Sequence, residues 1–302
     1  MPENEPQWTQ KAYAKINLLL DVTGKRPDGY HEVSMIMQSV NLFDTIRFSL
    51  RHETISLRVD RQDLPCDSSN LAYRAAELLR QECGVSKGVH IDLVKRIPMA
   101  AGLAGGSSDA AAVLRGLNQL WQLSLSAGDL EQLAARLGSD VPFCLWGGTV
   151  HATGRGEKIE PLADFAGIGV VLAHPPLQVS TAWVYGNYQL GVASGCPDIA
   201  LMRRAIVHND FSVVTQNLYN ALETVTVPAY PQIGEIKTAL SQAGASGVLM
   251  SGSGPTVFAL SPTLAEAKKL AARLSIGPEV DILIAETVAR EEQMNVPTII
   301  TG

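Results

Sequence analysis

A glycine-rich stretch has the composition of a phosphate-binding loop. It runs from Pro98 to Ala112 with the sequence PMAAGLAGGSSDAAA, so that a flexible turn leads directly into strong helix formers. Glycines allow several backbone N–H groups to approach one ligand, and the N-terminus of the helix that follows carries a partial positive charge. Ser107 and Ser108 add two hydroxyl groups at the same place. The stretch predicts a polyphosphate site.

The loop alone leaves other interpretations open. Ser107 or Ser108 could simply cap the helix of an ordinary loop, because serine is common at that position. A Walker A motif is excluded, since no Gly-Lys-Ser/Thr ends the stretch. A Rossmann fingerprint fits badly, because the glycine spacing differs and no acidic residue closes a following strand about 20 residues later.

Two further residues have the chemistry that phosphoryl transfer to an alcohol needs. The reaction requires a group that accepts the hydroxyl proton and positive potential beside the transferred phosphoryl group. Asp140 follows Gly138, where a helix is expected to end, so its carboxylate is a candidate base; capping of a helix near Pro142 is the alternative. Lys15 lies in a predicted strand, where lysine is usually only a solvated side chain.

Hydrophobic periodicity predicts the elements that position these residues. Residues 11–22 alternate with period two, which is typical of a long strand, and Asp28-Gly29 is a turn sequence. Further extended segments are expected at 31–40, 45–50, 54–59, 89–95, 149–153, 169–173, 248–251, 255–260 and 281–288. Helices are expected at 70–82, 106–121, 128–137, 180–188, 198–207, 231–243 and 264–274. Mixed strands and helices in both halves predict an α+β fold.

Length and charge limit the domain number and the partners. A chain of 302 residues predicts two domains, and the glycine-rich and charged segment 154–168 is the expected boundary, giving residues 1–160 and 161–302. Lys and Arg number 24 against 30 Asp and Glu, a net charge of −6 without a block of like charges. Nucleic acid and membrane surfaces are therefore not expected partners. Oligomeric state is not predicted.

The chain is expected to be cytoplasmic. Its first residues lack a basic segment followed by an apolar one, and no apolar stretch approaches the roughly 18 residues of a membrane-spanning helix. Four separated cysteines form no CxxC motif, so reduced, buried thiols are expected at Cys66, Cys83, Cys144 and Cys196. The tail from Glu291 to Gly302 has no predicted role.

The stretch from Pro98 to Ala112 resembles the central motif of the GHMP kinases, a family that includes galactokinase, homoserine kinase, mevalonate kinase and phosphomevalonate kinase. The family usually has glycine where this chain has Ala104, a departure that would tighten or reposition the loop. Four other stretches match in the same order and extend the resemblance over about residues 12–260: AKINL at 14–18, RPDGYH at 26–31, GSDVP at 138–142 and SGSGP at 251–255.

The resemblance implies a role for each matching residue. Asp140 would be the catalytic base and Lys15 its cationic partner. The ATP phosphates would lie against Pro98, Met99, Ala100, Ala101, Gly102, Leu103, Ala104, Gly105, Gly106, Ser107 and Ser108. The second glycine loop, Gly252, Ser253 and Gly254, would close the phosphate end of the site, although the same sequence also suits a tight β turn.

The implied substrate carries a nucleobase. Tyr30 would stack on cytosine, His31 would hydrogen-bond to its edge and Asn17 would line the pocket, whereas without the resemblance the Tyr-His pair suits an exposed hairpin. Tyr185 would be a second stacking face, although a core position is equally open to it. ATP and Mg²⁺ are the implied cofactors, and no protein ligand for the metal is identified.

The implied activity is ATP-dependent phosphorylation of the 2-hydroxyl of a cytidine diphosphate-linked methylerythritol, in non-mevalonate isoprenoid precursor biosynthesis. A mevalonate or homoserine kinase is the alternative within the family, and Tyr30 and His31 argue against it. A non-catalytic nucleotide-binding module is disfavoured by Lys15 and Asp140, and an NAD-dependent redox enzyme by the glycine spacing. The implied fold joins an N-terminal domain like the second domain of ribosomal protein S5 to a ferredoxin-like C-terminal domain, with the active site between them.

Overall fold

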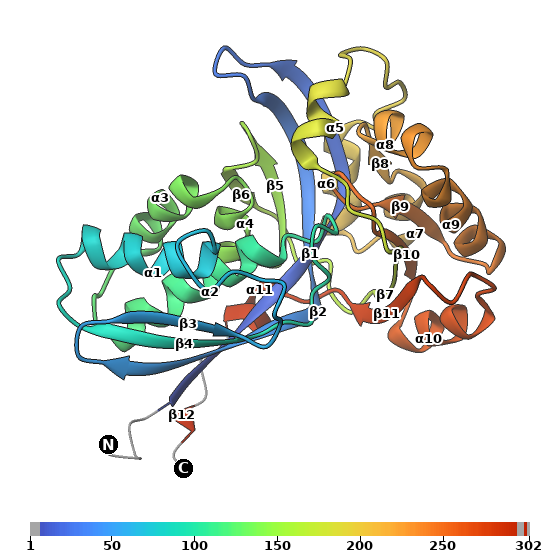
Figure 1. Ribbon diagram of the computed structural model, residues 1–302. Coiled ribbons are helices and arrows are strands. Elements are labelled where there is room, and N and C mark those ends of the chain that lie inside the picture. Colours follow the sequence, from blue (N-terminus) through green and yellow to red (C-terminus); the bar gives the residue numbers. More distant parts are fainter. Residues whose placement is uncertain (1–6, 295–298, 301–302) are drawn as a thin grey trace.

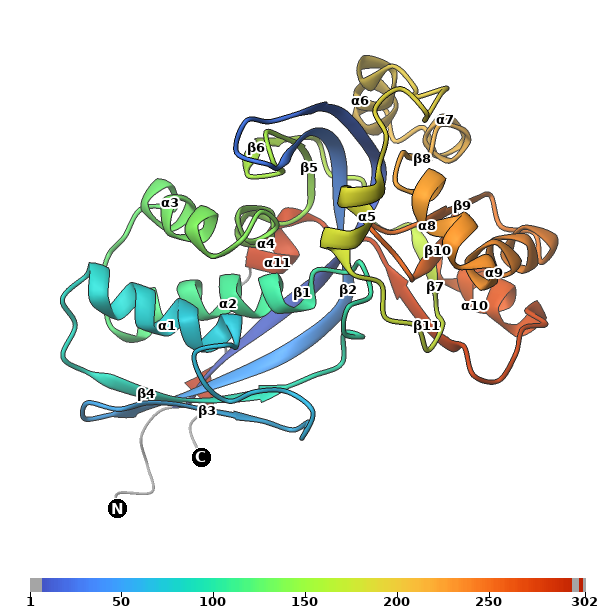
Figure 2. The same cartoon turned by 45° about the horizontal axis from the view of Figure 1, so that its top comes forward.

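The computed structural model describes residues 7–294 and 299–300, which form an α+β structure around two β-sheets (Figure 1). The larger sheet has eight strands. These are β1 (Gln7–Lys25), β2 (His31–Arg51), β3 (Ile55–Val59), β4 (Gly88–Val94), β5 (Thr149–Thr153), β6 (Lys158–Pro161), β8 (Tyr219–Asn220) and β12 (Ile299–Ile300). Helices cover one face of this sheet (Figure 2): α1 (Leu71–Glu82), α2 (Gly105–Leu120), α3 (Ala127–Leu137) and α4 (Val141–Trp146).

The smaller sheet is antiparallel throughout, with the spatial order β11-β7-β10-β9. Its strands are β7 (Gly169–His174), β9 (Gly247–Met250), β10 (Val257–Ser261) and β11 (Asp281–Glu286), and α9 (Pro231–Gln242) and α10 (Leu264–Arg273) pack against them. The chain order β7-α9-β9-β10-α10-β11 with this strand order is the ferredoxin-like arrangement, as predicted. Four short helices intervene between β7 and α9: α5 (Thr181–Asn187), α6 (Ile199–Val207), α7 (Phe211–Gln216) and α8 (Glu223–Ala229).

Strand β1 carries catalytic candidates into the interior. It pairs with β2 along most of its length, but the register shifts between Tyr13 and Lys15 and again between Asn17 and Leu19. Such bulges twist a strand and redirect its side chains. Both faces of β1 are covered at this point, so Lys15 is only 4% exposed and Asn17 only 1%. The solvated strand lysine considered from the pattern alone is therefore wrong.

Most predicted elements are present, and the differences have local causes. Residues 31–40 and 45–50 form one strand, β2, because pairing with β1 and β4 continues across the expected break. Helix α4 was not predicted, because its sequence VPFCLW is apolar on all sides and has no helical period. Strand β6 lies in the segment expected to be a boundary. The last described elements are α11 (Arg290–Met294) and β12, which pairs with β1 at the edge of the larger sheet. The division at residues 160 and 161 stays a prediction.

The cysteines differ from expectation in exposure. All four are free, but only Cys144 is buried, whereas Cys66 and Cys196 are exposed. The prediction of buried thiols is therefore correct only for Cys144. Cys83 is half-buried, and Cys66 and Cys196 lie in loops outside the helices and strands. None of the helices described is long and apolar enough to cross a membrane.

Candidate active site

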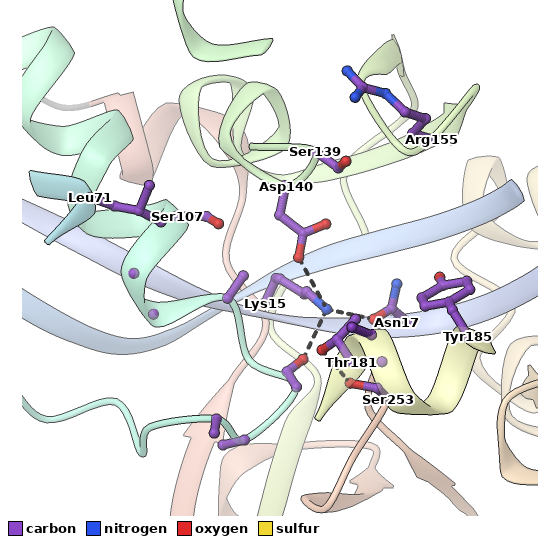
Figure 3. A pocket seen from close by; sticks show the side chains of 18 of the residues that line it. Lys15, Asn17, Leu71, Ser107, Ser139, Asp140, Arg155, Thr181, Tyr185 and Ser253 are labelled. Carbon is purple, nitrogen blue, oxygen red and sulfur yellow. Dashed lines mark hydrogen bonds and ion pairs between the residues drawn. The ribbon is translucent and has the colours of Figure 1, made fainter. Parts of the chain in front are cut away.

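A cavity of about 1310 Å³ lies where β1 and β2, the start of α2, the start of α4, α5 and the loop between β9 and β10 meet (Figure 3). It brings together most of the residues that the motifs indicated. The predicted residues on its wall are Lys15, Asn17, Tyr30, His31, Pro98, Met99, Ala100, Ala101, Gly102, Ala104, Gly105, Gly106, Ser107, Asp140, Tyr185, Gly252 and Ser253. Six separate stretches of the sequence therefore form one site.

Lys15 and Asp140 meet inside this cavity. The Lys15 Nζ lies 3.8 Å from Asp140 Oδ2 and donates hydrogen bonds to Asn17 Oδ1 (2.7 Å) and to the Gly102 carbonyl oxygen (2.8 Å). Three oxygen atoms thus surround one buried ammonium group. This geometry holds the cation between the candidate base and the loop predicted to bind phosphate.

Asp140 precedes the first residue of α4, but its side chain does not cap that helix. No N–H group of α4 donates to its carboxylate, and Pro142 occupies a position in the first turn where an N–H is dispensable. The carboxylate points into the cavity toward Lys15, and 33% of the side chain is exposed (Figure 3). The capping alternative for Asp140 is therefore wrong.

The predicted phosphate loop ends at the N-terminus of α2. Ala104 is the residue before the helix and has a φ of 58°, a left-handed conformation that costs a non-glycine residue about 1 to 2 kcal/mol. The first intrahelical bond runs from Ser108 N–H to the Ala104 carbonyl oxygen, so the N–H groups of Gly105, Gly106 and Ser107 lack helical partners. This turn has the donors and the dipole for an anion.

Three residues predicted for the site direct their side chains elsewhere or lie behind the wall. Leu103 is buried in the core. The Ser108 hydroxyl donates to the Tyr13 carbonyl oxygen (2.6 Å), because the side chain faces β1, so it is not available to a phosphate. Gly254 packs against Met250. None of these three residues lines the cavity.

The two glycine loops are in direct contact. Ser251 Oγ donates to the Gly102 carbonyl oxygen (2.9 Å), and a Cβ placed on Gly252 would lie 3.2 Å from Lys15 Nζ. Asn220, which the sequence did not single out, positions the second loop from behind by donating to the carbonyl oxygens of Met250 and Gly252 (2.8 Å each). The loop therefore forms a wall of the site rather than an isolated turn.

Aromatic residues gather at the other end of the cavity. The His31 ring lies 5.3 Å from that of Tyr185, and Tyr30 is 53% exposed beside them. Burial, with a smaller effect of the Lys25 ammonium, lowers the pKa of His31 and favours a neutral ring that can both donate and accept. Burial, reinforced by Asp140, raises the pKa of Tyr185, so its hydroxyl stays protonated. This end suits a flat, polar ring.

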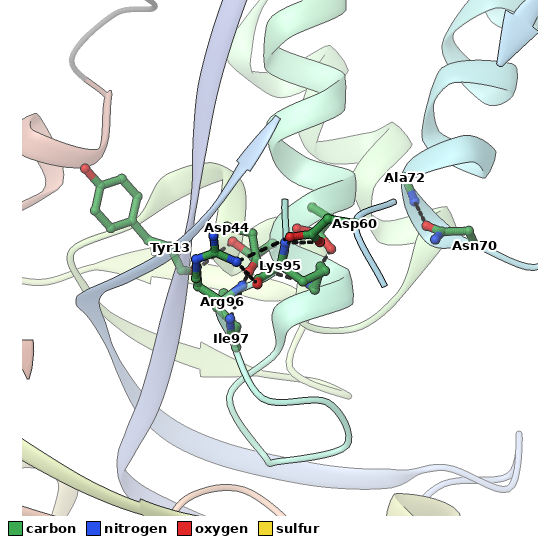
Figure 4. A network of polar contacts seen from close by, with 10 residues as sticks. Tyr13, Asp44, Asp60, Asn70, Ala72, Lys95, Arg96 and Ile97 are labelled. Carbon is green, nitrogen blue, oxygen red and sulfur yellow. Dashed lines mark hydrogen bonds and ion pairs between the residues drawn. The ribbon is translucent and has the colours of Figure 1, made fainter. Parts of the chain in front are cut away.

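A buried ionic network lies behind the phosphate loop (Figure 4). Lys95 Nζ donates to Asp44 and to Asp109 Oδ2 (2.6 Å), and Asp44 also accepts from the N–H groups of Arg96 and Ile97. Burial raises the pKa of Asp109 to about 8 against the lowering effect of Lys95. The network ties β2 and the end of β4 to the first turns of α2. No local pattern in the sequence indicates it, because its members are far apart in the chain.

Other wall residues were also missed. Ser139, Arg155 and Thr181 line the cavity, and Thr181 Oγ1 lies 2.8 Å from Ser253 Oγ. The glycines around Arg155 were the available signal, since the sequence TGRGEK indicates a tight turn that can present a side chain. Among the described residues no group of three or more His, Cys, Asp or Glu side chains is arranged to hold a metal ion.

Comparison with known proteins identifies the family. The model of the GHMP kinases N terminal domain matches residues 70–148, and that of GHMP kinases C terminal matches residues 202–279. The relatives that match include two proteins named 4-diphosphocytidyl-2-C-methyl-D-erythritol kinase. The one from Pelotomaculum thermopropionicum is 51% identical over 92% of this chain and 97% of its own length, and the one from Brevibacillus brevis is 53% identical over 83% and 86%.

Solved structures agree with this result. A crystal structure of 4-(cytidine 5'-diphospho)-2C-methyl-D-erythritol kinase has a TM-score of 0.75 and 33% identity, over 92% of this chain and 98% of that one. A homoserine kinase from Cytophaga hutchinsonii has a TM-score of 0.79 at 20% identity, over 99% of both chains, which supports the fold alone. The resemblance carried by the motifs is confirmed, and the chain belongs to the GHMP kinase family.

Proposed function

We propose that this GHMP kinase transfers the γ-phosphoryl group of ATP to the 2-hydroxyl of 4-diphosphocytidyl-2-C-methyl-D-erythritol, a step of non-mevalonate isoprenoid precursor biosynthesis. The relatives that are named as this kinase support the choice of this substrate. The observation that carries the proposal is the Lys15–Asp140 pair, which lies in one cavity with the N-terminus of α2 on one side and Tyr30, His31 and Tyr185 on the other.

Each end of the cavity has a part in the proposed reaction. The free N–H groups at the start of α2 bind the phosphates of ATP, as helix N-termini do for anions. Tyr30 and Tyr185 stack on the cytosine, and neutral His31 hydrogen-bonds to its edge. This places the acceptor alcohol in the middle, next to Asp140.

The central residues act on the acceptor hydroxyl. Asp140 accepts the hydroxyl proton as the bond to phosphorus forms, and Lys15 stabilises negative charge on the acceptor and transferred oxygens. The Lys15 ammonium does not swing freely, because Asn17 and Gly102 hold it in place. A cation already held in position stabilises the transition state without reorganisation.

Magnesium enters this proposal as part of the nucleotide substrate. Mg²⁺ is usually bound through phosphate oxygens and water with one or two protein ligands, and it neutralises charge on the β- and γ-phosphates. The Ser107 hydroxyl, on the cavity wall at the start of α2, fits such a minor ligand role. A cytoplasmic location is also part of this proposal.

The experiment that tests the activity is ADP release with Mg-ATP and three alcohols offered separately: 4-diphosphocytidyl-2-C-methyl-D-erythritol, mevalonate and homoserine. We expect turnover only with the first. Turnover with either of the others would assign a different acceptor to the same kinase fold. ATP binding without turnover of any of them would favour a non-catalytic nucleotide-binding protein.

A variant tests the role of Asp140. A positioned base contributes about 10²- to 10⁴-fold to the rate, so Asp140→Asn should lower kcat by that factor and leave ATP affinity unchanged. Asp281→Asn is the matched control, because it makes the same chemical change at an exposed position in the smaller sheet. Turnover of Asp140→Asn at the control rate would remove Asp140 from the mechanism.

A further inference from the structure

Helix α4 follows Asp140 directly, and two side chains outside the family motifs bind its far end. The Asp140 carbonyl oxygen accepts a hydrogen bond from Cys144 N–H (3.1 Å). The Cys144 carbonyl oxygen in turn accepts from Arg115 Nη1 of α2 (2.7 Å) and from Gln293 Nε2 of α11 (3.0 Å). Arg115 Nη1 also donates to the Leu145 carbonyl oxygen (3.2 Å). A short chain of hydrogen bonds therefore connects Arg115 and Gln293 with the backbone of Asp140.

Stability alone does not explain a buried arginine at this position. Among the described residues, the guanidinium of Arg115 donates only to these two carbonyl oxygens of α4, and its buried Nε and Nη2 atoms have no hydrogen-bond partner. Burial, opposed by the weaker effects of Cys144 and Tyr13, lowers the pKa of Arg115 to about 10. Buried ionic groups can often be replaced by well-packed apolar ones without loss of stability. A role in holding α4 accounts for the hydrogen bonds that this arginine does make.

Helix α11 packs closely against the same end of α4 (Figure 2). Gln293 is buried, and it lies against Gly147, the residue that ends α4. Gly147 has a φ of 69°, and a Cβ added there would overlap the Gln293 side chain. The Arg290 guanidinium lies 4.1 Å from the centroid of the Trp146 ring beside it. Part of the tail to which the sequence assigned no role thus contacts the helix that follows Asp140.

Helix α2 connects this contact with the rest of the site. In the proposed reaction its N-terminus binds the phosphates of ATP. The Ser108 hydroxyl attaches it to the Tyr13 carbonyl oxygen of β1, two residues before Lys15. Through Arg115 the same helix holds α4, and with it Asp140. One helix therefore sets the distances between the base, the cation and the transferred phosphoryl group.

We propose that Arg115, assisted by Gln293, positions Asp140 for the acceptor hydroxyl by holding the C-terminal end of α4 against α2. Neither side chain lines the cavity, so both are positioning residues that act on kcat rather than on KM. A displacement of about 1 Å at a reacting group can lower the rate about 100-fold. This inference rests on the proposed function, because it takes Asp140 as the base of that reaction.

The test is steady-state kinetics with variants of the full chain. Arg115→Met removes the charge and the hydrogen bonds but keeps a long apolar side chain, Arg115→Lys keeps the charge, and Gln293→Leu removes one neutral donor. Arg80→Met is the matched control, because Arg80 Nη1 also donates to a backbone carbonyl oxygen, that of Glu53 (2.7 Å), and Arg80 does not line the cavity. Urea unfolding establishes that each variant is folded.

The kinetic effect should fall on kcat. Arg115→Met should lower kcat about 10- to 100-fold relative to Arg80→Met, with KM for ATP and for the acceptor changed by no more than about twofold. Arg115→Lys should recover part of this loss, and Gln293→Leu should lower kcat by about threefold to tenfold. When Asp140 is already asparagine, Arg115→Met should change the residual kcat by less than about twofold, because residues that act through one group are not additive.

A crystal structure of Arg115→Met gives a measurement that does not depend on turnover. We expect α4 to be displaced and the 3.8 Å approach of Lys15 Nζ to Asp140 Oδ2 to be lost, whereas Arg80→Met should keep it. If Arg115→Met yields little folded protein, Arg115→Lys and Gln293→Leu carry both measurements.

Other outcomes would overturn the proposal. A kcat at the control value in the Arg115 variants would show that the contact with α4 does not position the base, and a rise in KM alone would assign Arg115 to substrate binding. A full further loss in the Asp140→Asn background would show that Arg115 acts independently of Asp140. If the unaltered protein turned over no acceptor, the proposed function would be wrong. The crystal structure would then decide the positioning by itself, and an unmoved Asp140 would refute it.

Discussion

Replacing Gly102 with alanine should separate the two glycine loops and impair the site. Gly102 has a φ of 74°, and a Cβ added there would lie 2.0 Å from the carbonyl oxygen of Ser251. That oxygen belongs to the backbone, so no side-chain rotation can relieve the overlap. Gly167 is the matched control, because its φ is 78° and nothing lies within 4 Å of its added Cβ.

The contacts of Gly102 indicate how much more stability Gly102→Ala should lose than Gly167→Ala. A left-handed non-glycine residue costs about 1 to 2 kcal/mol, and this cost is common to both positions. At Gly102 the loops must also move apart, so its carbonyl oxygen loses the hydrogen bonds from Lys15 Nζ (2.8 Å) and Ser251 Oγ (2.9 Å). A hydrogen bond from a charged group contributes about 1.5 to 3 kcal/mol and a neutral one about 1 kcal/mol. Gly102→Ala should therefore lose about 2 to 4 kcal/mol more than Gly167→Ala.

Two measurements check this expectation. Urea unfolding should show a small loss of stability for Gly167→Ala and a larger one for Gly102→Ala. If the loss falls on the catalytic arrangement, kcat/KM in the ADP-release assay should be roughly 30- to 1000-fold lower for Gly102→Ala than for the control. If the two variants had equal stability and equal kcat/KM, the contact between the two glycine loops would not be what holds Lys15 in position.

Three further outcomes are expected. Tyr30→Ala should raise KM for the cytidine substrate with little effect on KM for ATP, and an unchanged KM in steady-state kinetics would refute the stacking role. Lys95→Met leaves two buried carboxylates unpaired, so urea unfolding should show a loss of about 3 to 5 kcal/mol, and an unaltered midpoint would contradict the buried network. Burial raises the pKa of Asp109 to about 8 in the folded protein. Between about pH 4 and pH 8 the folded protein therefore keeps a proton that the unfolded chain has released. The free energy of unfolding should decline as the pH rises through this range. In urea unfolding at pH 5, 7 and 9, the free energy of unfolding of Asp109→Asn should depend less on pH than that of the unaltered protein. The same pH dependence in both proteins would contradict the raised pKa of Asp109.

Contiguous features of the site were predictable from the sequence. The glycine loop and the start of α2 are adjacent in the chain, and the conformational needs of glycine and of a helix N-terminus are local. Long strands and helices such as β1 and α2 were also predictable, because their sequences show a regular hydrophobic period. Short elements such as α4 and β8 did not, since six and two residues carry too little pattern.

The side-chain directions depended on contacts from elsewhere. The pattern placed Ser107 and Ser108 together at a phosphate, but the neighbouring Tyr13 carbonyl oxygen accepts the second hydroxyl. Ala104 departs from the family's usual glycine, and the left-handed conformation at that position gives the reason for the usual residue. The direction of the Ser108 side chain follows from how the loop packs on β1, and that packing is not encoded in the loop alone.

The sequence by itself determined the chemical parts of this protein: a loop for phosphate, a carboxylate, a lysine and a Tyr-His pair, in an order that indicates a GHMP kinase. Tertiary structure decided which of these parts meet. Lys15 and Asp140 come within 3.8 Å only because β1 is bulged and buried and α4 begins beside it. The Lys95 network and Asn220 could not be found in the sequence for the same reason. Their roles depend on partners far away in the chain, and long-range pairing leaves no periodic trace in either partner.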